Sequence, residues 1–235
     1  MLTDIHTHIV PNVDDGARST EESLALLDML AAQGVCSSIA TPHFYAHNCL
    51  SLDSHLERVS KEFNELKAQL REGMPHIHLG HEVHYFKGIS SCEDIKKLTI
   101  NNTNYILLEL PYSDISESVV NEIIDLNLNL GLKPILAHIE RYIDRRGIIS
   151  VFDVIRDGYA LAHINCDSLF DKKCRKLCCK LIKEGLISFI ASDTHSVEFR
   201  PPRLAKGLEI LEGEFGSALT QRLMKNAASL ISSGD

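Results

Sequence analysis

Histidines and carboxylates stand in this chain at the ends of short apolar runs, where they could bind metal ions. Each run is typical of a β-strand, and seven of them end in such polar residues: His6-Thr7-His8, Thr41-Pro42-His43, Gly80-His81-Glu82, Leu108-Glu109, Ala137-His138, His163-Ile164-Asn165 and Ser192-Asp193-Thr194-His195. In a parallel βα barrel the reactive groups gather where the strands end. The order, apolar first and polar last, therefore predicts one multi-metal site of a metal-dependent hydrolase.

Two of these ends place both of their polar side chains on one side of a strand. Side chains alternate between the two faces of a strand, so the imidazoles of His6 and His8 project to the same side. Asp193 and His195 repeat this geometry and combine a carboxylate oxygen with a nitrogen. One metal ion can therefore take both members of either pair, although His-x-His alone is a weak motif.

Two glutamates, Glu82 and Glu109, end runs rich in Leu, Ile and Val. A carboxylate buried in such a place needs a cation or a hydrogen-bond network. The alternative for each glutamate alone is an exposed surface position, but the complete set of strand ends favours the metal site. Histidine and carboxylate ligands without thiolate indicate Mn, Fe or Zn rather than a structural zinc site of the Cys type.

Two arginines follow strand ends closely enough to reach the mouth of the predicted metal site. Arg141 comes three residues after His138, and Arg200 comes five residues after His195. A guanidinium group suits bidentate contact with phosphate oxygens. A surface salt bridge is the alternative for each arginine.

The remaining histidines are assigned smaller roles. His81 and His84 flank Glu82 and are the weaker candidates for a place at the site, and His163 could support a ligand through a hydrogen bond. The others are expected at the surface or in helix packing: His47, His55, His76 and His78.

Strands and helices alternate along the chain. The apolar runs predict strands over residues 2–6, 35–40, 77–83, 105–110, 134–138, 161–165 and 186–191. Amphipathic patterns predict helices over residues 19–34, 54–70, 117–130, 150–156, 171–184, 203–211 and 218–231. This alternation predicts an α/β fold with a parallel sheet, and seven strands with polar ends favour a closed or nearly closed barrel over an open sheet.

Composition is that of a soluble globular protein with one domain over residues 1–235. Hydrophobic residues make up 44% and charged residues 24%, and the net charge of −8 comes without a dense Lys/Arg cluster, so nucleic acid is not expected as a partner. No secretion signal or membrane span is recognisable, and we expect a cytoplasmic protein without membrane insertion.

The seven cysteines form no CxxC pair, and none is followed by Arg six positions later. An odd count without such pairs suits a reducing compartment. The Cys-x5-Arg phosphate-binding loop of cysteine-based phosphatases is therefore missing. Cys174 and Cys178, with Cys179 beside them, are interpreted as packing residues on one helix.

The motifs resemble those of the PHP (polymerase and histidinol phosphatase) superfamily, and within it the manganese-dependent protein-tyrosine phosphatases of bacterial capsular and exopolysaccharide operons. The matching segments include Asp4-Ile5-His6-Thr7-His8, Val13-Asp14-Asp15-Gly16, Thr41-Pro42-His43, Gly80-His81-Glu82, His138-Ile139-Glu140-Arg141-Tyr142, Ser192-Asp193-Thr194-His195 and Arg200-Pro201-Pro202. They span nearly the whole chain. Residues 143–157 match the family poorly.

This resemblance implies a distorted seven-stranded (βα)7 barrel of the PHP type and three divalent metal ions, manganese first and iron or zinc as alternatives. Carried over by motif, the metal ligands fall into three sets: His6, His8, Glu82 and Asp193; Glu82 as a bridge with Glu109 and His138; Asp15, His43 and His195. Arg141 and Arg200 would hold the phosphoryl oxygens. Three ions, four carboxylates and two arginines sum to about +4, which attracts a phosphate dianion.

The implied reaction is hydrolysis of a phosphate monoester by water that the metals activate. The implied substrate is a phosphotyrosine protein, a tyrosine autokinase that regulates synthesis of surface polysaccharide. Two alternatives remain open among phosphatases and binding proteins: a small-molecule phosphatase of the histidinol-phosphatase type, and a metal-loaded interaction domain without turnover. An amidohydrolase also carries His-x-His on a barrel, but a carboxylated Lys often bridges its metals, whereas Glu82 is the bridge candidate here.

Overall fold

Parallel strands form the centre of the molecule. The computed structural model describes residues 2–47 and 51–232. Its strands are β1 (Leu2–Thr7), β2 (Val35–Ala40), β3 (His43–Phe44), β4 (His76–Leu79), β5 (Glu82–His84), β6 (Tyr105–Glu109), β7 (Lys133–Leu136), β8 (Leu161–Asn165) and β9 (Phe189–Ala191). They pair in the orders β1-β2-β4 and β3-β5-β6-β7-β8-β9, and every pair is parallel. The predicted α/β fold with a parallel sheet is confirmed.

The predicted strand over residues 77–83 corresponds to two strands, β4 and β5, and the short strand β3 after the predicted strand over residues 35–40 was not predicted. Residues 41–42, Thr41-Pro42, lie between β2 and β3, and Gly80-His81 lie between β4 and β5. Proline has no N–H for a strand ladder, and Gly80 has little room for a side chain, because an added Cβ would lie 3.0 Å from Ile100 Cγ1. The backbones remain connected across the division, since Gly80 N donates to Ala40 O at 2.8 Å and Glu82 N to Pro42 O at 3.0 Å.

The first and last strands also meet. Thr7 and Thr194 form a parallel bridge, and His8 N donates to Thr194 O at 2.9 Å while Asp193 N donates to His6 O at 3.0 Å. The segment after β1 and the segment after β9 are thereby held together. These are two of the segments from which the polar strand ends come.

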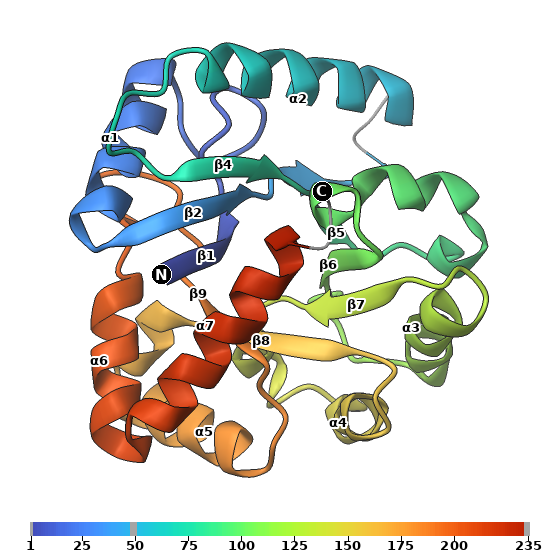
Figure 1. Cartoon of the computed structure of the whole chain (residues 1–235). Helices are drawn as coiled ribbons and strands as arrows, with labels where there is room; N and C mark the ends of the chain where they lie inside the picture. The colour runs from blue at the N-terminus through green and yellow to red at the C-terminus, as the bar shows by residue number, and fades with distance from the viewer. Residues whose placement is uncertain (1, 48–50, 233–235) are drawn as a thin grey trace.

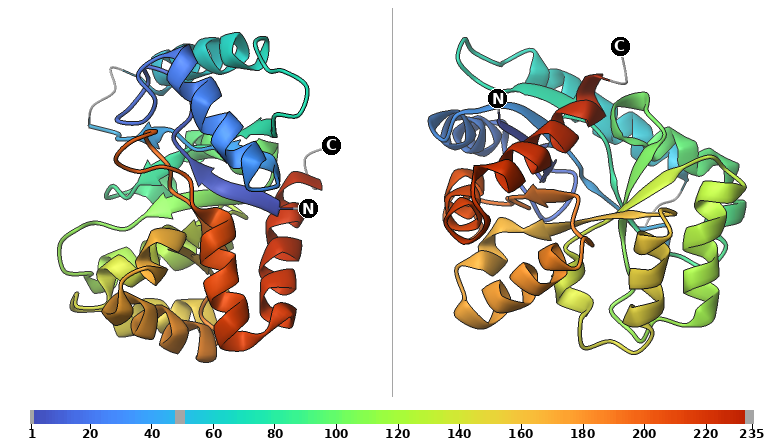
Figure 2. Two further views of the ribbon diagram at one scale, coloured as in Figure 1. Left: turned by 90° about the vertical axis from the view of Figure 1, so that its left-hand side faces the viewer. Right: turned by 60° about the horizontal axis from the view of Figure 1, so that its bottom comes forward.

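Helices surround the strands (Figures 1 and 2). They are α1 (Thr20–Ala32), α2 (Leu52–Lys67), α3 (Glu117–Leu128), α4 (Ile148–Arg156), α5 (Lys172–Lys183), α6 (Leu204–Phe215) and α7 (Ser217–Ser232). Each corresponds to a predicted helix. The predicted N-terminal cap of α1 is present, since Ser19 Oγ accepts from Glu22 N at 3.3 Å.

The last helix, α7, crosses the ends at which strands begin (Figure 1). Asn226 Nδ2 donates to the carbonyl of Ser188, just before β9, at 3.0 Å. Asn101 Nδ2, in a segment that precedes β6, donates to the carbonyl of Ile231 at 3.2 Å. The apolar interior is therefore covered on that side, and the polar strand ends face the opposite side.

Short 3-10 helices lie in segments for which the sequence patterns predicted neither a helix nor a strand. They are η1 (Ile89–Ser91), η2 (Glu93–Leu98), η3 (Ile100–Asn102), η4 (Ile139–Tyr142) and η5 (Cys166–Leu169).

Cys178 is buried in α5 and Cys174 and Cys179 are partly buried, and all three are free thiols, as the packing interpretation expects. Cys49 lies outside the described residues. Within the described ranges no helix is long and apolar enough to span a bilayer.

Candidate metal centre

The predicted site residues converge where the strands end. His6, in β1, and His8, just after it, lie beside Glu82 at the start of β5 and Asp193 just after β9. Contacts among them join the whole predicted set in one continuous cluster: His6, His8, Asp15, His43, Glu82, Glu109, His138, Arg141, Asp193, His195 and Arg200. The sequence reasoning that these residues come together is correct.

Four side-chain atoms of the cluster surround one point. His6 Nε2 lies 3.0 Å from His8 Nε2, and Glu82 Oε2 lies 3.2 Å and 3.3 Å from these two nitrogens. Asp193 Oδ1 is 3.5 Å from both. Ligands that sit about 2.1 Å from an ion in octahedral or tetrahedral geometry are about 3.0–3.4 Å apart. The spacing of these atoms therefore fits a divalent ion between them.

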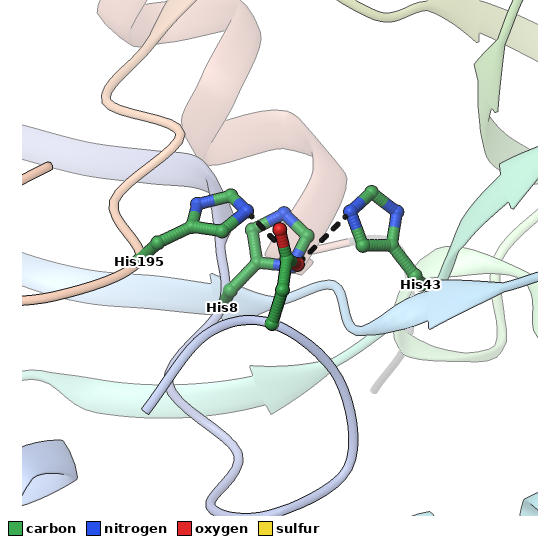
Figure 3. A group of neighbouring side chains, drawn as sticks. His8, His43 and His195 are labelled. Atoms are coloured by element: carbon green, nitrogen blue, oxygen red, sulfur yellow. Dashed lines mark ion pairs between the residues drawn. The ribbon is translucent and has the colours of Figure 1, made fainter. Parts of the chain in front are cut away.

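A second group surrounds the carboxylate of Asp15. Asp15 Oδ1 lies 3.3 Å from His43 Nε2 and 3.3 Å from His195 Nε2. His8 also belongs to this group, as the close approach of the three imidazoles in Figure 3 shows. The side chain of Asp15 is 66% exposed, whereas that of His195 is 5% exposed, so this group opens to the solvent.

A third group lies around Glu109. His138 Nε2 is 2.9 Å from Glu82 Oε1 and 3.7 Å from Glu109 Oε1. His43 can be grouped with Glu82 and Glu109, and its Nδ1 lies 3.0 Å from Glu82 Oε2, the oxygen that also faces His6 and His8. The two oxygens of Glu82 thus face different partners, which is the arrangement that a bridging carboxylate needs. His8 and His43 each belong to two groups, whereas in the predicted sets Glu82 was the one shared residue.

Two ligand candidates have unusual backbone conformations. His138 has φ of 35° and Asp193 has φ of 53°, both in the left-handed region that residues other than glycine rarely adopt. His138 comes two residues after the end of β7, and Asp193 comes two residues after the end of β9. Strain of this kind is found at functional sites, where the surrounding structure enforces it. Here it turns both side chains toward the cluster at the point where the strand ends.

Three further side chains hold the ligand candidates in place. Asp14 Oδ2 is 2.7 Å from His8 Nδ1, His163 Nε2 is 3.0 Å from His6 Nδ1, and His84 Nδ1 is 2.9 Å from Glu109 Oε2. A partner on the second ring nitrogen fixes the orientation of a metal-binding imidazole. His84 therefore reaches the site through Glu109, and His163 has the supporting position that its spacing suggested.

Sequence reasoning missed Asp14 and Tyr112. Asp14 is adjacent to Asp15, and that pair was the available signal; its Oδ2 also accepts from His43 N at 3.0 Å. The hydroxyl of Tyr112 donates to Glu109 Oε1 at 2.5 Å, three residues after a predicted ligand. His81 does not join the cluster. Its ring is buried and packs against that of His55, with the ring centroids 5.2 Å apart.

Both arginines point at one oxygen of Asp193. Arg141 Nη2 donates to Asp193 Oδ2 at 2.8 Å and Arg200 Nη2 at 2.6 Å. Asn165 Nδ2 donates to the same oxygen at 2.6 Å. Each arginine side chain is 38% exposed, so the guanidinium groups reach the mouth as predicted. Both form ion pairs with Asp193, a carboxylate of the cluster, rather than with a carboxylate at the outer surface.

The cluster holds its carboxylates ionised. Burial raises the pKa of Glu82 and Asp193, but neighbouring histidines, His6 first among them, outweigh burial and keep both pKa values well below the usual range. Burial lowers the pKa of His43, yet the neighbouring carboxylates of Asp15 and Glu82 raise it to about 9. Negative charge fixed in a buried place favours a cation.

The donor set fits divalent metal ions. Within the described residues, Glu82 Oε2 and His195 Nε2 are buried and have no well-oriented hydrogen bond, although each faces a possible ligand atom. Unsatisfied buried polar atoms are costly, and an ion between them would remove that cost. Nitrogen and carboxylate oxygen donors without thiolate suit Mn, Fe or Zn.

Comparisons with known proteins agree with this fold and this cluster, which are those of a metal-binding α/β protein. The model of the family described as "Capsular polysaccharide synthesis, CpsB/CapC" matches residues 2–232. The chain therefore belongs to the CpsB/CapC family, and the resemblance drawn from its motifs is confirmed.

Relatives extend over the whole chain. It is 32% identical to the tyrosine-protein phosphatase YwqE of Bacillus subtilis, over 98% of this chain and 91% of the relative. It is 30% identical to the tyrosine-protein phosphatase CpsB of Streptococcus agalactiae serotype III, over 98% of each. A solved structure from work on YwqE and on CpsB of Streptococcus pneumoniae, described as unique metal-dependent tyrosine phosphatases, superposes with a TM-score of 0.81 at 29% identity, covering 100% of this chain and 96% of the other.

Proposed function

We propose that the chain is a metal-dependent protein-tyrosine phosphatase that acts in the cytoplasm on a phosphotyrosine protein. The observation that carries this proposal is the convergence of buried histidines and carboxylates beside two arginines that reach the mouth of the site. Membership of a family with tyrosine phosphatases supports the choice of substrate. Residues 1–235 form one domain in this proposal.

We count the barrel as seven-stranded, because β2 with β3, and β4 with β5, are each one chain run with a two-residue interruption. The bridge between Thr7 and Thr194 then joins the first run to the last. A closed ring of strands explains why polar ends that are far apart in sequence meet at one place.

Three divalent ions, manganese in our proposal, would be held by nine residues. The first ion would take His6, His8, Glu82 and Asp193; the second Glu82, Glu109 and His138; the third Asp15, His43 and His195. When bound, they would supply Lewis acidity and an activated water at neutral pH.

The protein's own residues would position and neutralise the substrate. Arg141 and Arg200 would donate to phosphoryl oxygens, on which negative charge develops as the oxygen of water bonds to phosphorus and the bond to the phenolic oxygen breaks. Asn165 would keep Asp193 oriented when the arginines engage the phosphoryl group, because it donates to the same oxygen at 2.6 Å. The products are inorganic phosphate and tyrosine.

The low basicity of a phenolate leaving group favours an aryl phosphate ester over an alkyl phosphate ester as the substrate. A phenol has a pKa near 10 and leaves more easily than an alkoxide, so a tyrosine phosphate needs less help from a general acid. Association of the family with capsular polysaccharide synthesis supports a tyrosine autokinase of that system as the partner. A small-molecule phosphatase of the histidinol-phosphatase type is the alternative.

A phosphate-release panel tests the proposal. The manganese-loaded protein is assayed with a phosphotyrosine peptide, the same peptide carrying phosphoserine, and histidinol phosphate. We expect the highest kcat/KM with the phosphotyrosine peptide. Preference for histidinol phosphate would replace the proposed substrate by a small molecule. Lack of turnover with all three would indicate a non-catalytic binding domain.

A further inference from the structure

An exposed aromatic ring stands beside the metal cluster. Phe199 is 82% exposed, and no other large apolar side chain in residues 2–47 and 51–232 is as exposed. It lines a cavity of about 460 Å³ together with Asp15, His195 and Arg200. A phenylalanine in water forgoes the burial that stabilises most aromatic side chains, so the ring is available to a partner that enters this cavity.

The loop that carries Phe199 is held by its own hydrogen bonds. Ser196 Oγ accepts from the backbone N–H groups of Phe199 and Arg200, both at 3.2 Å. The carbonyl of Arg200 accepts from His195 N at 3.0 Å and from Thr194 Oγ1 at 2.8 Å. The position of the Phe199 backbone is therefore tied to that of Arg200, whose guanidinium reaches Asp193.

We infer that Phe199 is a specificity-determining residue that packs against the aromatic ring of the phosphorylated tyrosine. The inference rests on the proposed function. A phosphoryl group held at Arg200 and the metal cluster would leave its ester substituent in the cavity that Phe199 lines. Two aromatic rings attract each other at centroid separations of about 4.5–7 Å, beyond the effect of area burial.

Charge in the cavity favours a neutral ring over a second anionic group. Apart from the cluster residues Asp15 and Arg200, the charged side chains that line it are Glu22, Glu198 and Arg18. The two carboxylates outnumber the one guanidinium group. A second phosphate or an acidic side chain would therefore meet net repulsion there, and the phenyl ring of a phosphotyrosine would not.

The neighbouring cavity is a poorer place for the ring. It has a volume of about 390 Å³ and is lined by Asp15, His43, Tyr45 and Arg58, among others. Its aromatic side chain is already engaged, since the ring centroid of Tyr45 lies 5.0 Å from that of His43 and 5.3 Å from that of His84. The free aromatic surface is on the Phe199 side of Asp15.

Steady-state kinetics with matched peptides test this inference. The variants are Phe199→Ala, Phe199→Tyr and, as a matched exposed control remote from the cluster, Leu128→Ala at the end of α3. Substrates are one peptide carrying either phosphotyrosine or phosphoserine. For Phe199→Ala we expect KM for the phosphotyrosine peptide to rise about tenfold with kcat nearly unchanged, and no change with phosphoserine. Phe199→Tyr should restore the wild-type KM, and Leu128→Ala should match the wild type.

Two contrary outcomes are distinguishable. If wild type hydrolyses the phosphotyrosine peptide and Phe199→Ala has the same KM, or loses equally with both peptides, the assignment of Phe199 is overturned and the proposed function stands. If wild type does not hydrolyse the phosphotyrosine peptide, the proposed function fails and the assignment of Phe199 fails with it.

Discussion

Asp14 Oδ2 lies 2.7 Å from His8 Nδ1, so a carboxylate outside the predicted ligand set orients an imidazole at the centre of the site. The same carboxylate accepts from the backbone N–H groups of Gly16 at 2.9 Å and His43 at 3.0 Å. Asp14 therefore links the segment after β1 to β3. Burial raises its pKa, but His8 and these hydrogen bonds lower it to about 2, which keeps the carboxylate charged at neutral pH.

Asp14→Asn should weaken metal binding without preventing folding. The amide retains the size of the carboxylate but removes the charge that makes His8 a better ligand, and loss of such a partner costs about 10–100-fold in affinity or activity. The measurement is a manganese titration followed by activity. Asp28→Asn is the control, because Asp28 forms an exposed ion pair with Arg71 at 2.7 Å on the surface. Equal manganese affinity in Asp14→Asn and the control would show that Asp14 does not support the metal site.

Glu82→Ala should remove more metal than Glu109→Ala. Glu82 Oε1 faces His138 at 2.9 Å while its Oε2 faces His6 at 3.2 Å, so its loss affects two groups, whereas Glu109 faces one. Elemental analysis should find a loss of more than one ion per chain for Glu82→Ala and a smaller loss for Glu109→Ala. Wild-type metal content in Glu82→Ala would refute the bridging role.

Arg141→Ala and Arg200→Ala should each lower kcat by roughly 10²–10³, the cost of removing one preorganised donor to transition-state charge. Arg→Lys should restore activity in part, because the ammonium keeps the charge but lacks the planar fork. Each arginine also donates to Asp193, so replacing both should weaken metal binding, whereas Asn165 should preserve it in the single variants. Near-wild-type kcat on a phosphotyrosine peptide in both single variants would contradict the phosphoryl-binding role.

His55→Gln should make the free energy of unfolding less sensitive to acid. Burial lowers the pKa of His55 to about 4 from an unfolded value of 6.5, so the unfolded chain binds the proton more readily, and stability present above pH 6.5 is lost as pH falls toward 4. One such group contributes a slope of at most about 1.4 kcal/mol per pH unit.

Urea unfolding between pH 7 and pH 5, with chelator present, measures this slope. His76→Gln is the control, because His76 is exposed on β4. His81, whose pKa is lowered to about 3 by burial, remains in all of the proteins and adds its own slope. An unchanged slope in His55→Gln would show that His55 is not held neutral by the fold.

The sequence was sufficient for the seven α-helices and for most strands, because these elements have simple local causes. Alternating and apolar runs gave β2 and β8 with the same bounds as the structure, and Ser19 marked the start of α1. The short strand β3 and the interruption at Gly80 were not predicted, and the second of these depends on the approach of Ile100 from elsewhere in the chain.

The site was predictable in membership but not in geometry. Residue types and their position after apolar runs identified the ligand candidates. The sharing of His8 and His43 between groups, and the support of Glu109 by Tyr112, depend on distances between strands that no local pattern contains. The left-handed conformations of His138 and Asp193 likewise are not marked by any local pattern and depend on the surrounding structure.

The most direct test of the central claim is phosphate release from a phosphotyrosine peptide by the same preparation before chelation, after chelation and after addition of Mn²⁺, with metal content measured at each stage. The claim predicts loss of activity with loss of metal, recovery with Mn²⁺, and little effect of a thiol-alkylating agent, since no cysteine belongs to the cluster in the described residues. Full activity in the metal-free protein, together with inactivation by alkylation, would contradict it.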